Sequence, residues 1–192
     1  MNIIFASNNE HKIREIQSIV PAKYKVISLK EAGIDIEIPE PHDTLEENAR
    51  EKAKTIYKLT GATCFSEDTG LEVFDLNGEP GVQSARYAGE DRSSTKNIEK
   101  LLLNLRDKKD RTAQFRAVIC LVLNGEEYLF EGIAKGKIVE TPRGTEGFGY
   151  DPVFVPDGAT KTFAEMSLIE KNAFNHRRKA ADKLVAFLNS LN

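Results

Sequence analysis

The feature that most constrains the fold of this chain is a long β-hairpin signal in its second half. A strand-like run covers residues 112–123, the pair Asn124-Gly125 follows, and a second strand-like run extends from Glu127 to about Val139. Asn-Gly between two such runs is a strong hairpin signal, because both residues accept the positive φ that the tight turn requires. The sequence therefore predicts two long antiparallel strands, which the rest of the fold has to accommodate.

The remaining apolar patterns predict short strands alternating with amphipathic helices. Strands are expected at residues 2–6, 24–29, 62–65 and 71–76, and the segments 33–43 and 141–158 are expected to be loops. Helices are expected over residues 10–20, between the caps Thr44 and Gly61, after Ser93 or Ser94, and from the capping box Ser167/Glu170 to about Asn189. With no repeat, low-complexity tract or linker, the chain is predicted to form one mixed α and β domain over residues 1–192.

Composition and charge argue against several classes of partner. The 192 residues carry 27 basic and 30 acidic side chains, a net charge of −3, so nucleic acid binding is not indicated. The longest apolar run, residues 117–123, is far shorter than a membrane span, and the N-terminus lacks the basic region of a signal peptide. Cys64 and Cys120 are expected to be small buried residues kept reduced. We therefore predict a cytoplasmic protein with no membrane partner.

The first candidate site is the segment Ser7-Asn8-Asn9-Glu10-His11-Lys12, between a strand and a helix. Backbone N–H groups at a helix N-terminus have no partner within the helix, and the helix dipole favours an anion there. Lys12 adds a positive charge, so this segment could bind a triphosphate. A plain N-cap with polar surface residues is the alternative, and the glycine content is too low for a Walker A loop.

The second candidate is Glu67-Asp68-Thr69-Gly70, which follows an apolar strand. Adjacent acids leaving a strand point to opposite sides, but a turn could bring both to one ion. Mg²⁺ takes carboxylate oxygens together with water and phosphate oxygens, and Glu40 in the acidic loop could supply a third ligand. A simple turn between two strands is the alternative interpretation.

Two further segments suggest a base-binding region. Residues 144–152 combine three glycines with Phe148 and Tyr150, which suggests close backbone approach and a ring that can stack on a ligand. No helix follows them, which excludes a dinucleotide fingerprint. Residues 171–179 are basic, and their Arg and His side chains could donate hydrogen bonds to a base carbonyl. A structural glycine loop and a solvated basic helix face are the alternatives.

Taken together, these segments resemble the inosine/xanthosine triphosphate pyrophosphatase family of house-cleaning nucleotide hydrolases. The resemblance covers nearly the whole chain and keeps the order of the family motifs. Asn175 stands where the family usually has Ser, and Thr69 replaces a more common Ser while keeping the hydroxyl. The matching segments are Ser7–Lys12, Glu47-Asn48-Ala49-Arg50-Glu51-Lys52-Ala53, Glu67–Leu71, Pro80–Val82, Ser84–Gly89, Gly147–Pro152, Phe163–Met166, Glu170–Ala173 and His176-Arg177.

The resemblance implies an elongated α/β fold: a long mixed sheet with flanking helices, two lobes around a central cleft, and a homodimer. It implies Mg²⁺-dependent hydrolysis of ITP, dITP and XTP between the α and β phosphates. Asp68 is then the expected general base, and Glu40, Glu67 and Asp68 are the expected metal ligands. The expected substrate-binding residues are Ser7, Asn8, Asn9, Glu10, His11, Lys12, Thr69, Phe148, Gly149, Tyr150, Asp151, Lys171, His176 and Arg177.

Within this interpretation, Phe148 is expected to stack on the purine. Arg177, near Lys171 and His176, is expected to donate to the carbonyl at position 6, which would disfavour the amino group of adenine. Two other functions remain as alternatives: a pyrophosphatase acting on modified pyrimidine nucleotides, and a non-catalytic nucleotide sensor. An RNA-binding module is suggested only by the basic run at 176–179.

Overall fold

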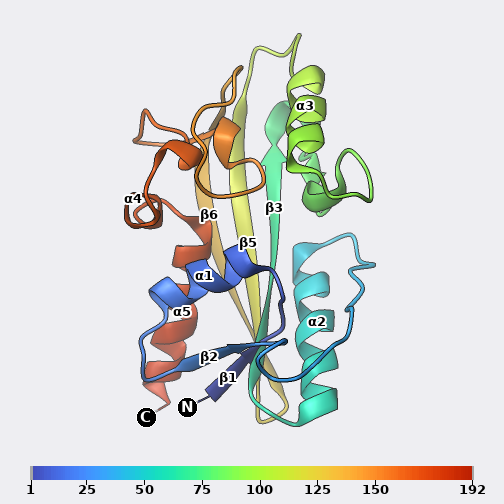
Figure 1. The fold of residues 1–192 in the computed structure, drawn as a ribbon, viewed down its shortest axis with the longest axis vertical. Helices are drawn as coiled ribbons and strands as arrows, with labels where there is room; N and C mark the ends of the chain where they lie inside the picture. The colour runs from blue at the N-terminus through green and yellow to red at the C-terminus, as the bar shows by residue number, and fades with distance from the viewer. Residues whose placement is uncertain (1, 192) are drawn as a thin grey trace. The chain divides into compact units, whose positions relative to one another are not determined.

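The computed structural model describes residues 2–191, and its chain divides into two compact units made of discontinuous segments. Unit 1 contains residues 1–68, 117–132 and 177–192, and unit 2 contains residues 69–116 and 133–176. Six strands follow the order β2-β1-β3-β5-β6-β7, with β4 paired to β3. The predicted α/β class with a mixed sheet and flanking helices is confirmed (Figure 1).

In unit 1, β1 (Asn2–Phe5) pairs in parallel with β2 (Lys25–Ser28) and with β3 (Cys64–Val73). α1 (Glu10–Ile19) connects β1 to β2, and α2 (Leu45–Thr60) leads into β3. Thr44 caps α2 by accepting from the Glu47 N–H, and Gly61 ends the helix in the left-handed conformation, φ 64°. Both predicted caps are confirmed.

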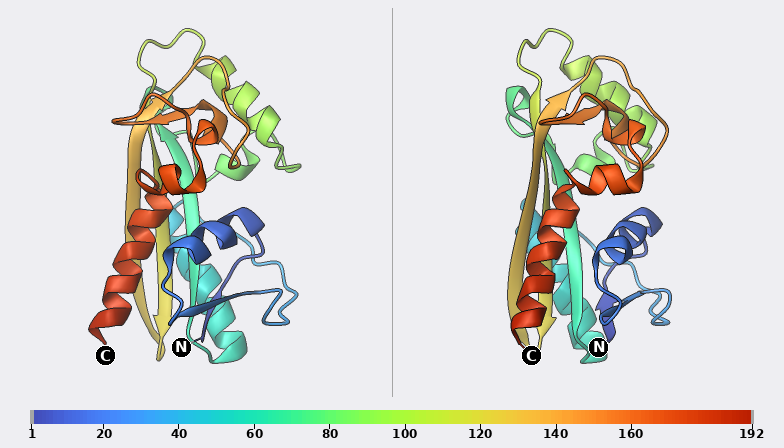
Figure 2. Two further views of the ribbon diagram at one scale, coloured as in Figure 1. Left: turned by 60° about the vertical axis from the view of Figure 1, so that its left-hand side comes forward. Right: turned by 90° about the vertical axis from the view of Figure 1, so that its left-hand side faces the viewer.

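The helices of unit 1 cover different faces of its strands. α2 touches β3 through Ser66 Oγ and Cys64 Sγ, which donate to the carbonyls of Ala49 and Ala53. Phe65, on the opposite face of β3, belongs to the apolar core that α1 and α5 (His176–Ser190) complete. Figures 1 and 2 show α2 and α5 on opposite sides of these strands.

In unit 2, β4 (Pro80–Gly81) pairs with β3, and α3 (Ser94–Asn104), capped by Ser93, covers a second apolar core. The predicted hairpin is confirmed as β5 (Thr112–Leu123) and β6 (Glu126–Ile138), with Asn124 and Gly125 both at positive φ. The chain after β6 turns back so that β7 (Phe154–Pro156), a strand the sequence did not predict, pairs antiparallel with it (orange in Figure 2).

Three predicted boundaries are wrong. The strand expected at residues 71–76 ends at Val73, and Phe74–Leu76 form a 3₁₀ helix. Residues 66–70 form no turn, because β3 continues as one strand from Cys64 to Val73. The predicted last helix is two helices, α4 (Leu168–Asn172) and α5, separated by residues 173–175, which are not helical. The Ser167/Glu170 capping box itself is confirmed. None of the helices formed by residues 2–191 has the length and apolarity needed to cross a bilayer.

Candidate active site

The continuous course of β3 decides where the adjacent acidic residues Glu67 and Asp68 point. Successive side chains of a strand point to opposite faces, so Glu67 and Asp68 diverge. Asp68 faces α2, where its Oδ1 lies 2.9 Å from Lys52 Nζ. Glu67 faces α1 and α5, where it pairs with Lys12 at 2.8 Å and with Arg177 at 3.1 Å. One buried strand therefore presents two separate carboxylate centres.

The first centre is built on Lys52. Its ammonium lies 2.5 Å from Glu40 Oε1, 2.9 Å from Asp68 Oδ1 and 3.0 Å from the Glu67 carbonyl oxygen. Lys52 and Asp68 are each 7% exposed. Burial opposes the charged form of Lys52, but Asp68 and Glu40 together raise its pKa, so the lysine is held as a cation.

The two carboxylates of this centre have different proton affinities. Burial raises the pKa of Asp68, and the lowering effects of Lys52 and Lys12 do not outweigh it. For Glu40, burial also opposes ionisation, but Lys52 holds its pKa below the usual value. Asp68 is therefore the stronger base of the pair. This is the property that a general base for water needs.

The loop that carries Glu40 is fixed by Asn48 on α2. The Asn48 side chain accepts from the His42 N–H at 2.9 Å and donates to the His42 carbonyl at 3.0 Å. Asn48 is buried, and its two bonds to His42 are partly buried. The amide thus holds the loop residue two positions after Glu40 against the same helix that presents Lys52.

The second centre surrounds Arg177, whose side chain is 1% exposed. Its guanidinium bonds to Glu15 on α1 and to Glu67 on β3, and Glu67 also pairs with Lys12. Burial disfavours the charged form, but Glu67 and Glu15 raise the pKa of Arg177 above its usual value. Arg177 therefore bridges α1 and β3 inside unit 1.

The segment Ser7–Lys12 forms an N-cap in this structure. Ser7 Oγ accepts from the Asn9 N–H, and Asn9 Oδ1 accepts from the Lys12 N–H, both at 3.1 Å, so α1 begins at Glu10. Asn8 Oδ1 accepts from the Lys30 N–H. Asn8 to His11 are exposed. Whether the segment also binds phosphate stays a prediction.

Apart from Arg177, the predicted base-binding residues lie in unit 2, where Asp151 holds Phe148 and Lys171. Its Oδ2 accepts from the Phe148 N–H at 2.9 Å and lies 2.7 Å from Lys171 Nζ. Gly147, at φ 76°, lies so close to this carboxylate that a Cβ could not fit. Lys171 Nζ is 5.4 Å from the centre of the Phe148 ring. The buried Asp151–Lys171 pair thus fixes the backbone of Phe148.

The other predicted residues of unit 2 have contacts of their own. The Tyr150 hydroxyl donates to the Ser84 carbonyl at 2.8 Å, inside the core. The ring of His176 stacks on Phe115, with centroids 4.8 Å apart. Gly149 and Thr69 are partly exposed. Next to Thr69, Gly70 is required by packing, because a Cβ there would lie 2.6 Å from the Gly81 carbonyl oxygen.

The structure brings Glu40 and Asp68 together, but it directs Glu67 away from them. No three His, Cys, Asp or Glu side chains converge as a metal site within residues 2–191. Glu40 and Asp68 do fit a cation, because both already hold the ammonium of Lys52, and carboxylate oxygens are the ligands Mg²⁺ prefers.

Lys52 is a site residue to which the sequence analysis assigned no role, although it lies in the matching segment Glu47–Ala53. The signal was present, because Lys52 falls on the inward face of α2 with Leu45, Ala49 and Ile56. A lysine is almost never buried unless it is paired, so this position itself points to an acidic partner. Glu15 is also buried on α1, but the sequence carried no comparable signal for it, because neighbouring helix positions such as Glu15 and Ile16 do not share a face.

Comparison with known proteins extends over nearly the whole chain. Residues 3–187 match the model of the Ham1 family. A dITP/XTP pyrophosphatase from Flavobacterium psychrophilum is 52% identical over 187 residues, covering 97% of this chain and 98% of its own. One from Flavobacterium johnsoniae is 51% identical and covers 98% of both chains. A Ham1 protein structure from Staphylococcus aureus superposes with a TM-score of 0.91, at 43% identity and full coverage of both chains. A HAM1 protein structure from Coxiella burnetii gives a TM-score of 0.90 at 37% identity, covering 99% of each chain.

Proposed function

Because the chain belongs to the Ham1 family, we propose that it is a nucleoside triphosphate pyrophosphatase that hydrolyses ITP, dITP and XTP to the monophosphate and pyrophosphate. The names of the relatives support the reaction and the deaminated purine substrates. The observation that carries the chemistry is the Glu40–Lys52–Asp68 cluster beside Lys12. It combines Asp68, a carboxylate whose pKa is raised, with lysine ammonium groups that can donate hydrogen bonds to phosphate oxygens.

The phosphate chain is assigned to the start of α1. Ser7, Asn9 and Lys12 lie where the first N–H groups of the helix and its dipole favour an anion, with Asn8, Glu10 and His11 around them. Lys12 is 17% exposed and pairs with Glu67, so a phosphate oxygen would compete for its ammonium. Lys52 supplies a second cation close to Asp68.

Catalysis is assigned to Asp68, acting as general base for the water that attacks the α-phosphorus. Glu40 and Asp68 are the proposed ligands of Mg²⁺. Glu67 does not supply a third converging oxygen; its proposed role is to position Lys12, with which it pairs. The bound ion would neutralise charge on the phosphate oxygens as pyrophosphate leaves. Lys52 keeps the two carboxylates close together, since like charges would otherwise repel.

Base recognition is assigned to unit 2. Phe148, held through Asp151 and partly exposed, is the proposed stacking ring, and Lys171 holds Asp151 in place. Thr69, Gly149, Tyr150 and His176 are the proposed neighbours of the nucleotide. We propose that Arg177 acts through Glu67, because its guanidinium is taken up by Glu15 and Glu67 within unit 1. Direct contact between Arg177 and the base stays a separate prediction.

We further propose that the protein works as a cytoplasmic homodimer. The resemblance to the family supports this assembly, and a mass measurement in solution tests it. Light scattering should give twice the 21.4 kDa mass of the chain. A mass equal to one chain at working concentration would exclude the dimer.

A nucleotide panel with Mg²⁺ tests the function. ITP, dITP and XTP should be cleaved in preference to ATP, GTP and UTP, and pyrophosphate should appear without orthophosphate. In ¹⁸O-labelled water the label should enter the monophosphate, because the α-phosphorus is attacked. Label found only in pyrophosphate would contradict the mechanism, and preference for a pyrimidine nucleotide would contradict the substrate class. Binding without turnover would indicate a nucleotide sensor.

A further inference from the structure

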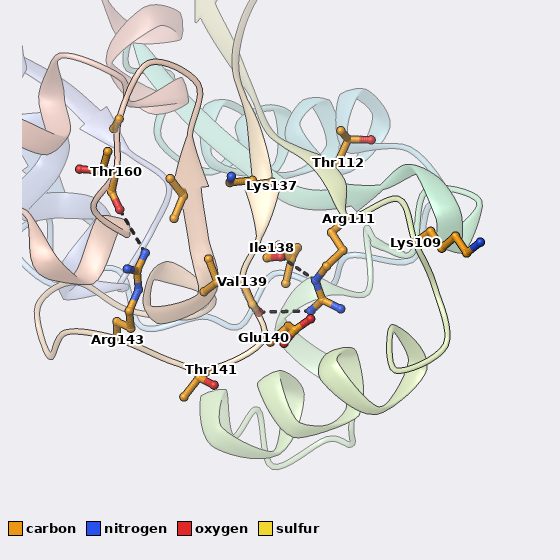
Figure 3. A pocket seen from close by; sticks show the side chains of 12 residues that line it. Lys109, Arg111, Thr112, Lys137, Ile138, Val139, Glu140, Thr141, Arg143 and Thr160 are labelled. Atoms are coloured by element: carbon orange, nitrogen blue, oxygen red, sulfur yellow. Dashed lines mark hydrogen bonds between the residues drawn. The ribbon is translucent and has the colours of Figure 1, made fainter.

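Unit 2 contains a pocket that the proposed function does not use. It has a volume of about 760 Å³ and lies where the start of β5 and the end of β6 meet the segment after β6 (Figure 3). This volume is within the range of small-molecule sites. No residue assigned above to catalysis, metal or substrate lines it.

The pocket is strongly basic although the chain as a whole is acidic. Of the described residues that line it, one is acidic, Glu140, and four are cationic: Lys109, Arg111, Lys137 and Arg143. The net charge of the chain is −3, so this excess of positive charge is local. Such a concentration of one sign of charge in a hollow attracts ligands of the opposite sign.

Arg111 is fixed by neutral groups. Its Nε donates to the Ile138 carbonyl at 2.8 Å, and its Nη2 donates to the Val139 carbonyl at 3.2 Å, as the dashed lines in Figure 3 show. Its Nη1 donates to the Leu105 carbonyl at 3.1 Å. These carbonyls orient the guanidinium without neutralising its charge. Binding of an anion to Arg111 therefore costs little free energy for ordering its side chain, which is already held in place.

Arg143, which lies in the segment after β6, is also held by hydrogen bonding to a backbone carbonyl. Its Nη2 donates to the Thr160 carbonyl at 3.1 Å, and its Nε lies 3.5 Å from Glu165, which compensates part of its charge. Lys109 and Lys137 are exposed and mobile enough to follow a ligand. Thr141 and Thr160 add hydroxyl donors at the rim.

We propose that this pocket binds a condensed phosphate, either free pyrophosphate or the phosphate chain of a nucleotide. Four cations around one volume match a ligand with several charged oxygens better than a single carboxylate. Arginine also recognises phosphate through paired N–H donors. The site is an accessory one, outside the residues proposed for catalysis, and it would let the protein respond to the phosphate products or nucleotides around it.

The test compares binding stoichiometry in Lys109→Ala/Lys137→Ala with wild type. Calorimetric titrations use pyrophosphate and, separately, α,β-methylene ITP, which resists cleavage between the α and β phosphorus. Wild type should bind two equivalents per chain of at least one probe. The double variant should keep one equivalent and weaken the other at least tenfold. Binding of pyrophosphate alone identifies the free product as the ligand, and binding of both probes includes nucleotides.

The matched control is Lys25→Ala/Lys58→Ala, which removes two exposed lysines outside the pocket. It should bind like wild type, so that a loss in the first variant cannot be attributed to net charge. Turnover of ITP at saturating substrate should stay within about twofold in both variants, which separates this proposal from the catalytic one. A single equivalent of each probe in wild type, or unchanged binding in Lys109→Ala/Lys137→Ala, would overturn it.

Discussion

At the scale of single residues, the chemistry depends on Asp68 being a base that keeps its position. Asp68→Asn removes the proton-accepting charge but leaves an oxygen that can still accept from Lys52. We expect kcat for ITP to fall by about 10²–10⁴-fold, the usual loss for a general base. Nucleotide affinity, measured by calorimetry, should change little because Lys12 and Lys52 remain.

Asp107→Asn is the control for this change, since it makes the same substitution at an exposed position. It should leave kcat and the melting temperature as in wild type. If Asp68→Asn kept near wild-type turnover at saturating Mg²⁺, Asp68 could not be the base.

Arg177 raises a different question, because it is both buried and a predicted specificity residue. Arg177→Ala would leave Glu15 and Glu67 buried without their cation. Breaking a buried pair in this way typically costs about 3–5 kcal/mol, so this variant should be severely destabilised. Arg177→Lys keeps the charge but cannot reach both carboxylates with a planar fork. We expect kcat/KM for ITP and ATP to fall by the same factor in Arg177→Lys.

Steady-state kinetics with both nucleotides checks this expectation, and Arg178→Lys is its control. Arg178 is the exposed neighbour, paired with Asp182 at 2.8 Å. A selective loss of ITP over ATP in Arg177→Lys alone would show that Arg177 faces the base carbonyl, as the sequence first suggested. It would exclude a role that acts only through Glu67.

At the scale of elements, α2 carries both Lys52 and the anchor for the Glu40 loop. Asn48→Ala removes two partly buried hydrogen bonds to His42, each of which contributes about 1 kcal/mol. The loop should then hold Glu40 less firmly beside Lys52. We expect a lower melting temperature and a several-fold rise in the Mg²⁺ concentration that gives half-maximal activity.

Thr44→Ala separates this effect from helix stability. It removes the N-cap of the same helix, at a typical cost of about 0.5–2 kcal/mol, but leaves the bonds to His42. Its Mg²⁺ requirement should match that of wild type. An equal shift in both variants would mean that Asn48 only stabilises α2.

The elements that could be predicted from sequence are those whose signals are local. The caps Thr44 and Gly61, and the Asn124-Gly125 turn, act within a few residues of themselves, so their positions were correct. Residues 66–70 look like a loop because they are polar. They form a buried strand because cations arrive from elsewhere, Lys12 from α1 and Lys52 from α2. No pattern within β3 encodes those partners.

The same reason explains why the arrangement of the candidate site could not be predicted from the sequence. The sequence assigned Glu40, Glu67 and Asp68 to one ion, but strand alternation separates the last two. The continuous helix expected across residues 167–189 would have put Lys171 and Arg178 on one face. The helix is instead interrupted before α5, and Lys171 pairs with Asp151 while Arg178 pairs with Asp182.

At the scale of the molecule, both units are made of discontinuous segments. The chain passes from one unit to the other at four points: within β3, between Arg116 and Ala117 in β5, between Gly132 and Ile133 in β6, and between His176 and Arg177 at the start of α5. A strand cannot unfold in one unit without disturbing the hydrogen-bonded residues that continue it. The connectivity therefore indicates a single cooperative unfolding unit, although a chain of this length could unfold in steps.

Ile56→Ala tests this cooperativity from unit 1. Ile56 is fully buried on α2, and its truncation should cost about 2–5 kcal/mol. If unfolding is shared, the slowest-exchanging amides of β7 in unit 2 should lose as much protection as those of β1, measured by hydrogen exchange. Leu101→Ala, at a fully buried position of α3, is the reciprocal variant and should lower protection in unit 1 equally. Loss of protection confined to the mutated unit would show two independently unfolding parts, because the continuity of the three strands would then not couple their stabilities.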